Sequence, residues 1–405
     1  MLSTGLTELQ QTRSPGGESV AADADRRLRF DRNEIAGAFG DIGTDLPLIV
    51  GMTLAAGLDS ASVLTMFGLM QIGTAWLYRL PMPVQPLKAM AALVIAQQIE
   101  GRVLYGAGFA VGVTMLLLTA TRAIDWLARV VPKSVVRGIQ FGLGLQLATI
   151  ALRDYARADG VPGYVIAGVG FLITVFLLGN RRFPPALFVM ALGVIYAFVF
   201  KINPRVVVES AGFHLPALHT PAWQDITTGF VLLALPQIPL SLGNSLLATR
   251  QIVSDLFPAK KLTVRRIAWT YSLMNLVNPF FSGIPTCHGS GGIAGHFAFG
   301  GRTGGSVILY GSLYVVLGLF FSTGFSEVIQ VFPLPILGVL LFFEGLALVR
   351  LIRDLADSAT DFIVALLVGM MALLLPYGYV VALVAGTALA YLSRRGAVAL
   401  EKVGH

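Results

Sequence analysis

Charged side chains are scarce in this sequence. Asp, Glu, Lys and Arg together make up 13% of its 405 residues, whereas hydrophobic residues make up 55%, and the mean hydropathy is +0.75. Soluble domains carry about 25% charged residues, so this composition excludes a soluble fold. The alternating pattern of outer-membrane strands is also absent, while apolar runs of about twenty residues recur. We therefore expect an all-α polytopic membrane protein whose surroundings are a lipid bilayer.

Cysteine is nearly absent as well. The one thiol, Cys287, excludes an intrachain disulfide framework and a cysteine-based zinc cluster. Glycine-rich nucleotide motifs and zinc-protease motifs do not occur in a context of strand and helix that would support them. No cofactor and no metal ion are therefore expected, and Cys287 is interpreted as a buried packing residue rather than a thiol ligand.

The net charge of +7 does not indicate a nucleic-acid partner, because the charge follows the membrane topology. Basic residues gather in the segments predicted to face the cytoplasm and are few in the outer loops, as the positive-inside rule requires. Both termini are then cytoplasmic, and the protein is placed in the cell (inner) membrane. Residues 1–30 are polar and lack an apolar signal-peptide core, so they are predicted to form a disordered cytoplasmic tail.

Two stretches of the chain interrupt the apolar pattern. Residues 283–302 contain Pro285 near their start, followed by several closely spaced glycines. Residues 80–98 contain several prolines in their first part, the last of which is Pro86. Each stretch is predicted to be extended first and helical afterwards. A helix that starts at mid-membrane leaves its first N–H groups without partners, so an anion can accept them. Two such stretches in corresponding places indicate the binding site of a transporter.

Fourteen membrane spans are predicted, seven in each half of the chain. They lie near residues 32–57, 61–80, 81–99, 103–121, 134–152, 162–180, 184–201, 225–249, 264–282, 283–299, 304–322, 327–349, 359–375 and 377–393. Because seven is odd, the second half enters the membrane in the opposite sense, which predicts inverted repeats. Spans 3 and 10 are the interrupted ones, and we interpret them as half-helices.

These spans define the predicted domain organisation. It consists of the cytoplasmic tail 1–30, a first seven-span repeat 31–202, an extracytoplasmic linker 203–224, a second inverted repeat 225–395 and a short cytoplasmic tail 396–405. No C-terminal regulatory domain is expected.

Polar residues at mid-membrane depth are further candidates for function. They are Asp41, Thr44 and Asp45 in span 1, Gln237, Ser241 and Asn244 in span 8, and Lys88 in span 3. Carboxylates at this depth are costly unless they face protein or water. The three polar residues of span 8 are spaced by four and then three, which places them on one helix face. Such a face, together with a fixed positive charge, suits an oxyanion.

Each of these residues has a structural interpretation beside the functional one. Asp41 and Asp45 have a structural role, as helix caps or as partners of Lys88, or they take part in proton coupling. A carboxylate beside a dianion would oppose binding unless the carboxylate is protonated, paired or turned away. Lys88 either pairs with Asp41 or offsets the charge of a substrate. His288 either titrates, hydrogen-bonds an oxyanion or caps the turn. Glu344, in span 12, is interpreted as a helix contact, because it lies outside the two interrupted stretches.

The interrupted stretches also carry recognisable motifs. Residues 83–88 (PVQPLK) resemble the P-x-Q-P-x-K signature of the molybdate transporter family, a branch of the sulfate permease superfamily. Residues 287–292, followed by 299–302, resemble its second signature, C-H-G-x-G-G with a trailing F-G-x-R. Residues 40–44 are similar to its G-D-x-G-T. The likeness covers the whole membrane region.

This resemblance implies a fold, a substrate and a set of binding residues. Spans 1–4 and 8–11 would form a core domain, and spans 5–7 and 12–14 a gate domain. The substrate would be a tetrahedral oxyanion, molybdate before tungstate or sulfate, and the superfamily suggests a homodimer. The implied binding residues are Gln85, Lys88, His288, Gly289, Ser290 and Gly291, to which Thr44 and Gln237 are added from their depth.

The predicted function is secondary active import of molybdate by alternating access. Proton symport through Asp41, Asp45 or His288 is a hypothesis that rests on ionisable groups at mid-depth. A sulfate transporter of the same fold and an anion channel are the alternatives, since half-helix dipoles also select ions in pores. A membrane enzyme built on Cys287 and His288 is disfavoured, because no residue is evident that would orient a nucleophile pair.

Overall fold

The structure is a computed structural model, and it describes residues 28–124, 126, 130–178, 185–201 and 211–395. The predicted tail 1–30, except its last three residues, lies outside the described residues. The same holds for the tail 396–405 and for the linker up to residue 210. Within the described part nearly every element is a helix, and the strands are two segments of three residues each.

The helices of the first half follow the apolar runs and end at capping residues. Asp59, for example, accepts a hydrogen bond from Ser62 N at one helix start, and Gly57 ends the preceding helix with φ 61°. The elements are α3 (Arg32–Ala38), α4 (Ile42–Ala56), α5 (Ser60–Tyr78), β1 (Val84–Pro86), α6 (Lys88–Gln97), α7 (Gly101–Ala120), α9 (Lys133–Ile150), α10 (Gly160–Leu177) and α11 (Pro185–Phe200). A π-helical turn, Ala151–Tyr155, extends α9.

The second half begins with one long irregular span. Its parts are α13 (Trp223–Gly229), a π-helical turn (Phe230–Ala234), α14 (Leu235–Leu240), a second π-helical turn (Ser241–Leu247) and α15 (Ala248–Leu256). Pro236 and Pro239 lack the N–H groups that a regular helix uses, and π-helical turns are frequent at functional sites. The other elements are α16 (Val264–Val277), β2 (Thr286–His288), α17 (Ser290–Ala298), α18 (Gly305–Phe320), α19 (Ser322–Val331), α20 (Leu334–Arg350), α21 (Ala359–Leu374) and α22 (Gly378–Arg394), with short 3₁₀ turns at Asn278–Phe281 and Leu351–Leu355.

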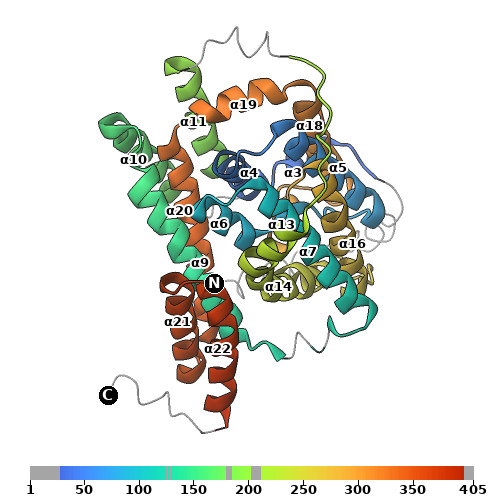
Figure 1. Ribbon diagram of the computed structural model, residues 1–405. Helices are drawn as coiled ribbons and strands as arrows, with labels where there is room; N and C mark the ends of the chain where they lie inside the picture. Colours follow the sequence, from blue (N-terminus) through green and yellow to red (C-terminus); the bar gives the residue numbers. More distant parts are fainter. Residues whose placement is uncertain (1–27, 125, 127–129, 179–184, 202–210, 396–405) are drawn as a thin grey trace, which may run out of the picture.

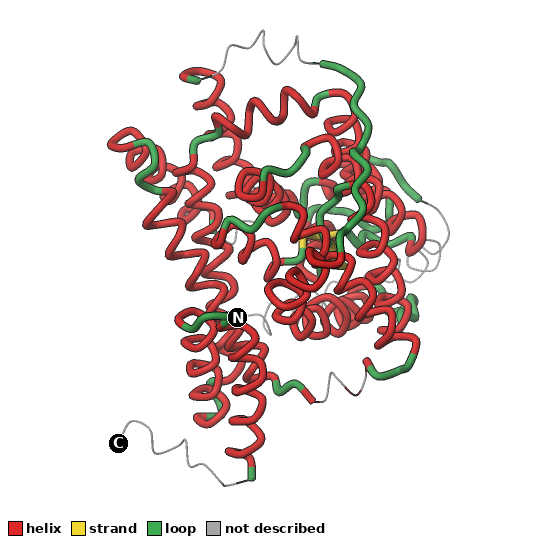
Figure 2. The backbone as a smooth tube through the Cα atoms, in the orientation of Figure 1, coloured by secondary structure: helices red, strands yellow, loops and turns green. Residues whose placement is uncertain are grey.

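The helices form two groups that lie side by side (Figure 1). In one group α9 packs on α20 and α21, and α10, α11 and α22 complete it. In the other group α5 packs on α18, and α7 packs on α13 and α16. The two strands lie inside this second group (Figure 2). Fully buried side chains such as Phe67, Met90 and Tyr271 fill its interior.

Seven of the described helices are long and apolar enough to cross a membrane, judged by length and composition. The number rises to eight if α18 and α19, which are bent by 94°, form one span. The helices α6, α11, α21 and α22 are apolar but shorter. The coarse expectation of an all-α membrane protein therefore fits the structure, whereas the count of fourteen spans stays a prediction.

Span 12 requires a correction. The predicted span 327–349 is not one helix, because α19 ends at Val331 and α20 begins at Leu334. Pro333 occupies the N-cap position of α20, and Pro335 lies in its first turn. Proline fixes its own backbone and disfavours helix in the residue before it, so the two helices separate here.

Candidate functional site

A short antiparallel strand pair joins the two interrupted stretches. Val84 of β1 lies opposite His288 of β2, and Pro86 lies opposite Thr286. Each strand leads into a short helix, α6 after β1 and α17 after β2. The predicted order of extended chain followed by helix is therefore observed in both stretches. Because the strands are antiparallel, the two helices leave the pair at opposite ends, with their amino ends directed toward it.

Two buried amide side chains complete the outer edges of the strand pair. Gln71 of α5 donates from Nε2 to Val84 O at 2.7 Å and accepts from Val84 N at 2.7 Å. Asn275 of α16 donates from Nδ2 to Thr286 O at 2.7 Å and accepts from Thr286 N at 2.9 Å. These bonds satisfy backbone groups that no water reaches. The sequence analysis missed both residues, although an amide within each of two apolar spans in corresponding places was a usable signal.

The amino end of α6 is held by a side chain from the irregular span. Gln237 Oε1 accepts from Ala89 N at 3.0 Å and from Met90 N at 3.3 Å. Its Nε2 donates to Ser241 Oγ at 3.0 Å, and this hydroxyl lies 2.8 Å from the hydroxyl of Tyr271. The hydrogen bond between Gln237 and Ser241 agrees with their predicted common face. Both ends of the Gln237 amide therefore have protein partners, and the side chain fixes the position of α6.

The amino end of α17 lies beside a buried carboxylate. A methyl group added at Gly292, in the first turn, would lie 2.3 Å from Asp41 Oδ2. Gln85 Nε2 donates to both carboxylate oxygens of Asp41 at 2.7 Å. Gly289, the N-cap residue of α17, has no side chain that could cap the helix. Asp41 is thus held by an amide and by the positive end of a helix dipole.

A cavity of about 260 Å³ opens where these elements meet. Seven of the eight residues predicted to bind substrate line it, namely Gln85, Lys88, Gln237, His288, Gly289, Ser290 and Gly291. Asn244, Ser245, Cys287 and Glu344 also line it, together with the apolar Leu240, Ala347, Leu348 and Leu351. The predicted Thr44 is not among the lining residues. Thr44 was chosen from its depth, and depth does not specify the direction in which a side chain points.

Lys88 forms an ion pair with Glu344 inside this cavity. Lys88 Nζ lies 3.5 Å from Glu344 Oε2, and the two side chains are 32% and 15% exposed. The alternative that Lys88 pairs with Asp41 is therefore wrong, because Asp41 is bonded to Gln85 instead. Glu344 does connect two helices, as predicted, but it also lines the cavity. The sequence analysis missed that role because α20 reaches the site through tertiary packing alone.

The imidazole of His288 is anchored away from the strand pair. Its Nε2 lies 2.7 Å from the hydroxyl of Thr270, and its ring packs edge-on against Tyr78 with centroids 5.5 Å apart. His288 Nδ1 is buried and has no hydrogen-bond partner among the described residues. The backbone carbonyl of His288 accepts from Thr249 Oγ1 at 3.3 Å. His288 thus connects the strand pair with α5, α15 and α16.

Asp45 lies in a separate buried polar cluster between α4 and α18. Its Oδ2 accepts from the hydroxyl of Tyr310 at 3.3 Å, and that hydroxyl lies 2.9 Å from the hydroxyl of Tyr314. The other oxygen, Oδ1, is buried without a partner in the described part of the chain. The ring of His296 packs against Tyr310 at 5.9 Å. Asp45 does not line the cavity, so any role in coupling would act from outside it.

Comparisons with known proteins agree with this architecture. A family model described as "Molybdate transporter of MFS superfamily" matches residues 33–147 and 229–348. The chain is 32% identical to Molybdate transporter 2 of Arabidopsis thaliana, over 86% of this chain and 85% of the relative. It is 29% identical to Molybdate transporter 1 of Chlamydomonas reinhardtii, over 91% of this chain and 92% of the relative.

Solved structures show the same fold. The transmembrane domain of the cyanobacterial bicarbonate transporter BicA superposes with a TM-score of 0.66 at 16% identity, over 90% of this chain and 98% of that one. SLC26A9 superposes with a TM-score of 0.64 at 15% identity, over 89% of this chain and 65% of that one. At this level of identity the likeness shows the fold alone, and it agrees with the expected all-α membrane protein.

Proposed function

The chain belongs to the molybdate transporter family, and from this membership we propose that it is a secondary active transporter that imports molybdate by alternating access. As a multi-pass membrane protein of a transporter family, it is not an enzyme. The observation that carries the proposal is the cavity at which the amino end of α17, the start of α6 and the charge of Lys88 meet.

We assign the hydrogen-bond donors of the site to α17. The first N–H groups of this helix, at Ser290 and Gly291, have no hydrogen-bond partner among the described residues, and both residues line the cavity. At α6 the second and third N–H groups, of Ala89 and Met90, already donate to Gln237, so we assign to that helix the role of placing Lys88. One full positive charge, backbone donors and a helix dipole together stabilise an oxyanion that has lost its water.

Charge does not distinguish molybdate from tungstate or sulfate, since all three are tetrahedral dianions. Selection must therefore come from the size of the cavity and the placement of its donors. Leu240, Ala347 and Leu348 form apolar parts of its wall, and such walls reject an anion that does not fit, because they offer nothing to replace lost hydration. We expect molybdate and tungstate to compete well and sulfate poorly.

Binding of a dianion requires Glu344 to release Lys88. A carboxylate and a dianion about 6 Å apart repel each other by roughly 5.5 kcal/mol at an effective dielectric constant of 20. The carboxylate must therefore turn away or take up a proton when the anion arrives. Glu344 joins Asp41, Asp45 and His288 as a candidate for proton coupling, and its contact with Lys88 supports it directly.

The same ion pair supports alternating access, because it connects the two groups of helices. Lys88 starts α6 in the group that holds the strand pair, and Glu344 belongs to α20 in the group around α9. We propose that the group that holds the strand pair is the core domain and that the group around α9 is the gate domain. Movement of one group against the other then separates or restores the pair, which connects the occupancy of the cavity to the position of the domains.

Paired features of the two halves support fourteen spans in two inverted repeats, with α6 and α17 as half-helices. If residues 31–202 and 225–395 are equivalent, α5 corresponds to α16 and α7 to α18. The contact between α5 and α18 is then equivalent to the contact between α16 and α7. Gln71 on α5 and Asn275 on α16 also hold the first residue of β1 and of β2 in the same manner. A position in the cell membrane with both termini cytoplasmic, and a homodimer, remain predictions.

Uptake of labelled molybdate into proteoliposomes tests this function. We expect saturable uptake that tungstate inhibits, that a large excess of sulfate inhibits weakly and that an inward proton gradient accelerates. Counter-substrate acceleration would distinguish a carrier from a pore. Single-channel currents would contradict the carrier, and uptake indifferent to pH gradient and protonophore would remove the proton symport.

A further inference from the structure

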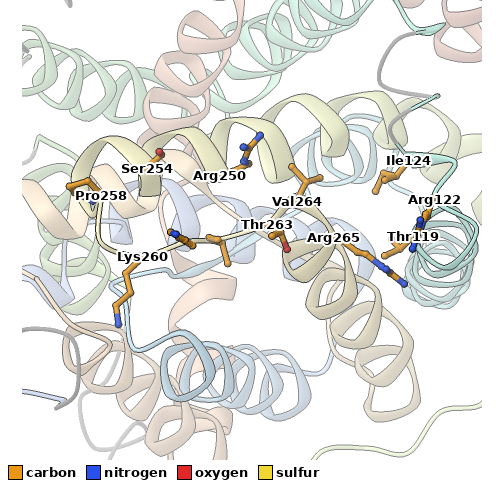
Figure 3. A pocket seen from close by; sticks show the side chains of 12 residues that line it. Thr119, Arg122, Ile124, Arg250, Ser254, Pro258, Lys260, Thr263, Val264 and Arg265 are labelled. Carbon is orange, nitrogen blue, oxygen red and sulfur yellow. The ribbon is translucent and has the colours of Figure 1, made fainter.

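A second, larger cavity lies apart from the one described above. It has a volume of about 590 Å³ and is lined by twelve residues, none of which also lines the cavity at Lys88. Its walls come from the end of α7, from α15, from the loop that follows α15 and from the start of α16 (Figure 3). Five of the lining residues are basic and none is acidic, namely Arg122, Arg250, Lys260, Lys261 and Arg265. We call this the basic cavity.

Four of these five charges have no ion-pair partner among the residues that the structure describes. In the described part of the chain, no carboxylate forms an ion pair with Arg122, Arg250, Lys261 or Arg265. Asp255, on the same helix as Arg250, accepts from Gln251 Nε2 at 2.8 Å. Gathering like charges around one hollow is unfavourable unless an anion is drawn into it, and it raises the local concentration of anions strongly.

The backbone adds to the positive potential of the basic cavity. Thr263 and Val264, at the amino end of α16, both line it. Thr263 Oγ1 accepts from Arg266 N at 3.2 Å and so caps this helix of fourteen residues. The hydroxyl hydrogen of Thr263 remains available to an acceptor in the cavity. A helix amino end combined with several guanidinium groups is the arrangement that proteins use to bind phosphate.

The basic cavity also borders a surface suited to lipid. Trp269 and Leu273 follow Arg265 by one and two turns along α16, and their side chains are 43% and 61% exposed. Tryptophan at the end of an apolar helix is typical of the membrane interface. A headgroup in the cavity could therefore extend its acyl chains along exposed apolar side chains of α16.

From the charges, the helix end and the adjoining apolar surface, we propose that the basic cavity binds a phosphate group, carried either by an anionic lipid or by a soluble polyphosphate. Anionic lipid is the source that the exposed Trp269 and Leu273 favour. Basic pockets between membrane helices bind such headgroups in other proteins. This inference is independent of the proposed transport function, because it uses none of the residues at Lys88.

The test compares the full-length protein with the double variant Arg250→Gln/Arg265→Gln. Its matched control is Arg350→Gln/Arg353→Gln, which removes two exposed arginines that do not line the basic cavity. Each protein is purified from nanodiscs of phosphatidylcholine with phosphatidylglycerol, and retained lipid is measured by native mass spectrometry. In a second arm, inositol hexakisphosphate is added to lipid-stripped protein and the shift in melting temperature is measured. Molybdate binding checks that each variant is folded.

The outcomes separate the two sources of phosphate. We expect the wild type and the control to retain phosphatidylglycerol, and the Arg250→Gln/Arg265→Gln variant to lose it at least tenfold. Stabilisation by inositol hexakisphosphate without lipid retention, again lost in that variant, would assign the site to a soluble ligand. The inference is overturned if neither ligand binds, or if the variant and the control lose binding equally.

Discussion

The ammonium group of Lys88 lies 3.5 Å from a carboxylate oxygen of Glu344, across the boundary between α6 and α20. Both residues line the same cavity, so in the absence of an anion each charge balances the other. This arrangement makes Glu344 a competitor of the substrate for Lys88. The consequences can be tested one residue at a time.

Replacement of Glu344 by glutamine is expected to tighten molybdate binding. The uncharged amide no longer competes for Lys88 and no longer repels the dianion, so the Kd measured by titration calorimetry should fall about tenfold, equivalent to about 1.4 kcal/mol. Uptake should also lose its stimulation by an inward proton gradient. The control is Glu327→Gln, which neutralises an exposed carboxylate on α19. An unchanged Kd together with unchanged stimulation would contradict the role assigned to Glu344.

Replacement of Lys88 by alanine is expected to abolish molybdate uptake while expression and folding persist. The cavity then holds no positive side chain, and Glu344 remains to repel the anion. Uptake and size-exclusion profiles are measured together. The double variant Lys88→Met/Glu344→Gln removes both charges, so it should fold normally and still fail to transport. If Lys88→Ala expresses poorly and the double variant regains both expression and uptake, Lys88 is structural.

Replacement of Gln71 by leucine and replacement of Asn275 by leucine are expected to destabilise the strand pair by similar amounts. Each substitution leaves one buried N–H and one buried C=O of a strand without a partner, at about 1–3 kcal/mol for each group. Melting temperature and molybdate binding should both fall. Gln251→Leu, at an exposed position on α15, is the control. Retention of full binding by either variant would show that the strand edge does not need its amide.

Alanine at Gly292 is expected to displace Asp41 and to abolish uptake. The added methyl group would lie 2.3 Å from Asp41 Oδ2 and 2.4 Å from Pro83 Cγ, so the first turn of α17 or the carboxylate must move. Gly73→Ala is the control, because nothing lies within 4 Å of the position of its methyl group. Normal uptake by Gly292→Ala would mean that the carboxylate and α17 need not remain in contact.

Much of the architecture could be predicted because its causes are local. Pro86 and Pro285 end any helix that precedes them, and the apolar residues that follow form the short helices α6 and α17. The spacing of Gln237 and Ser241 likewise predicted that they share one helix face, and the hydrogen bond between them agrees with this. In each case the physical cause acts within a few residues of chain, so the sequence pattern was sufficient.

The partners of individual polar groups could not be predicted in this way. One of the alternatives paired Asp41 with Lys88, yet Lys88 forms its ion pair with Glu344, and Gln85 donates to the carboxylate of Asp41. Thr44 has a suitable depth but does not line the cavity. An ion pair or a hydrogen bond selects its partner by distance and direction, and neither follows from position along a span.

The sequence by itself determined the membrane class, the two interruptions and the motifs of the family. Hydropathy and the backbone restrictions of proline and glycine are local properties of the chain, so they do not depend on which segments pack together. Only the tertiary structure decided that Glu344, more than 250 residues from Lys88 along the chain, reaches the same cavity, and that Gln71 and Asn275 close the edges of one strand pair. These contacts arise when packed helices bring distant segments within hydrogen-bonding range, and no local pattern encodes which segments will meet.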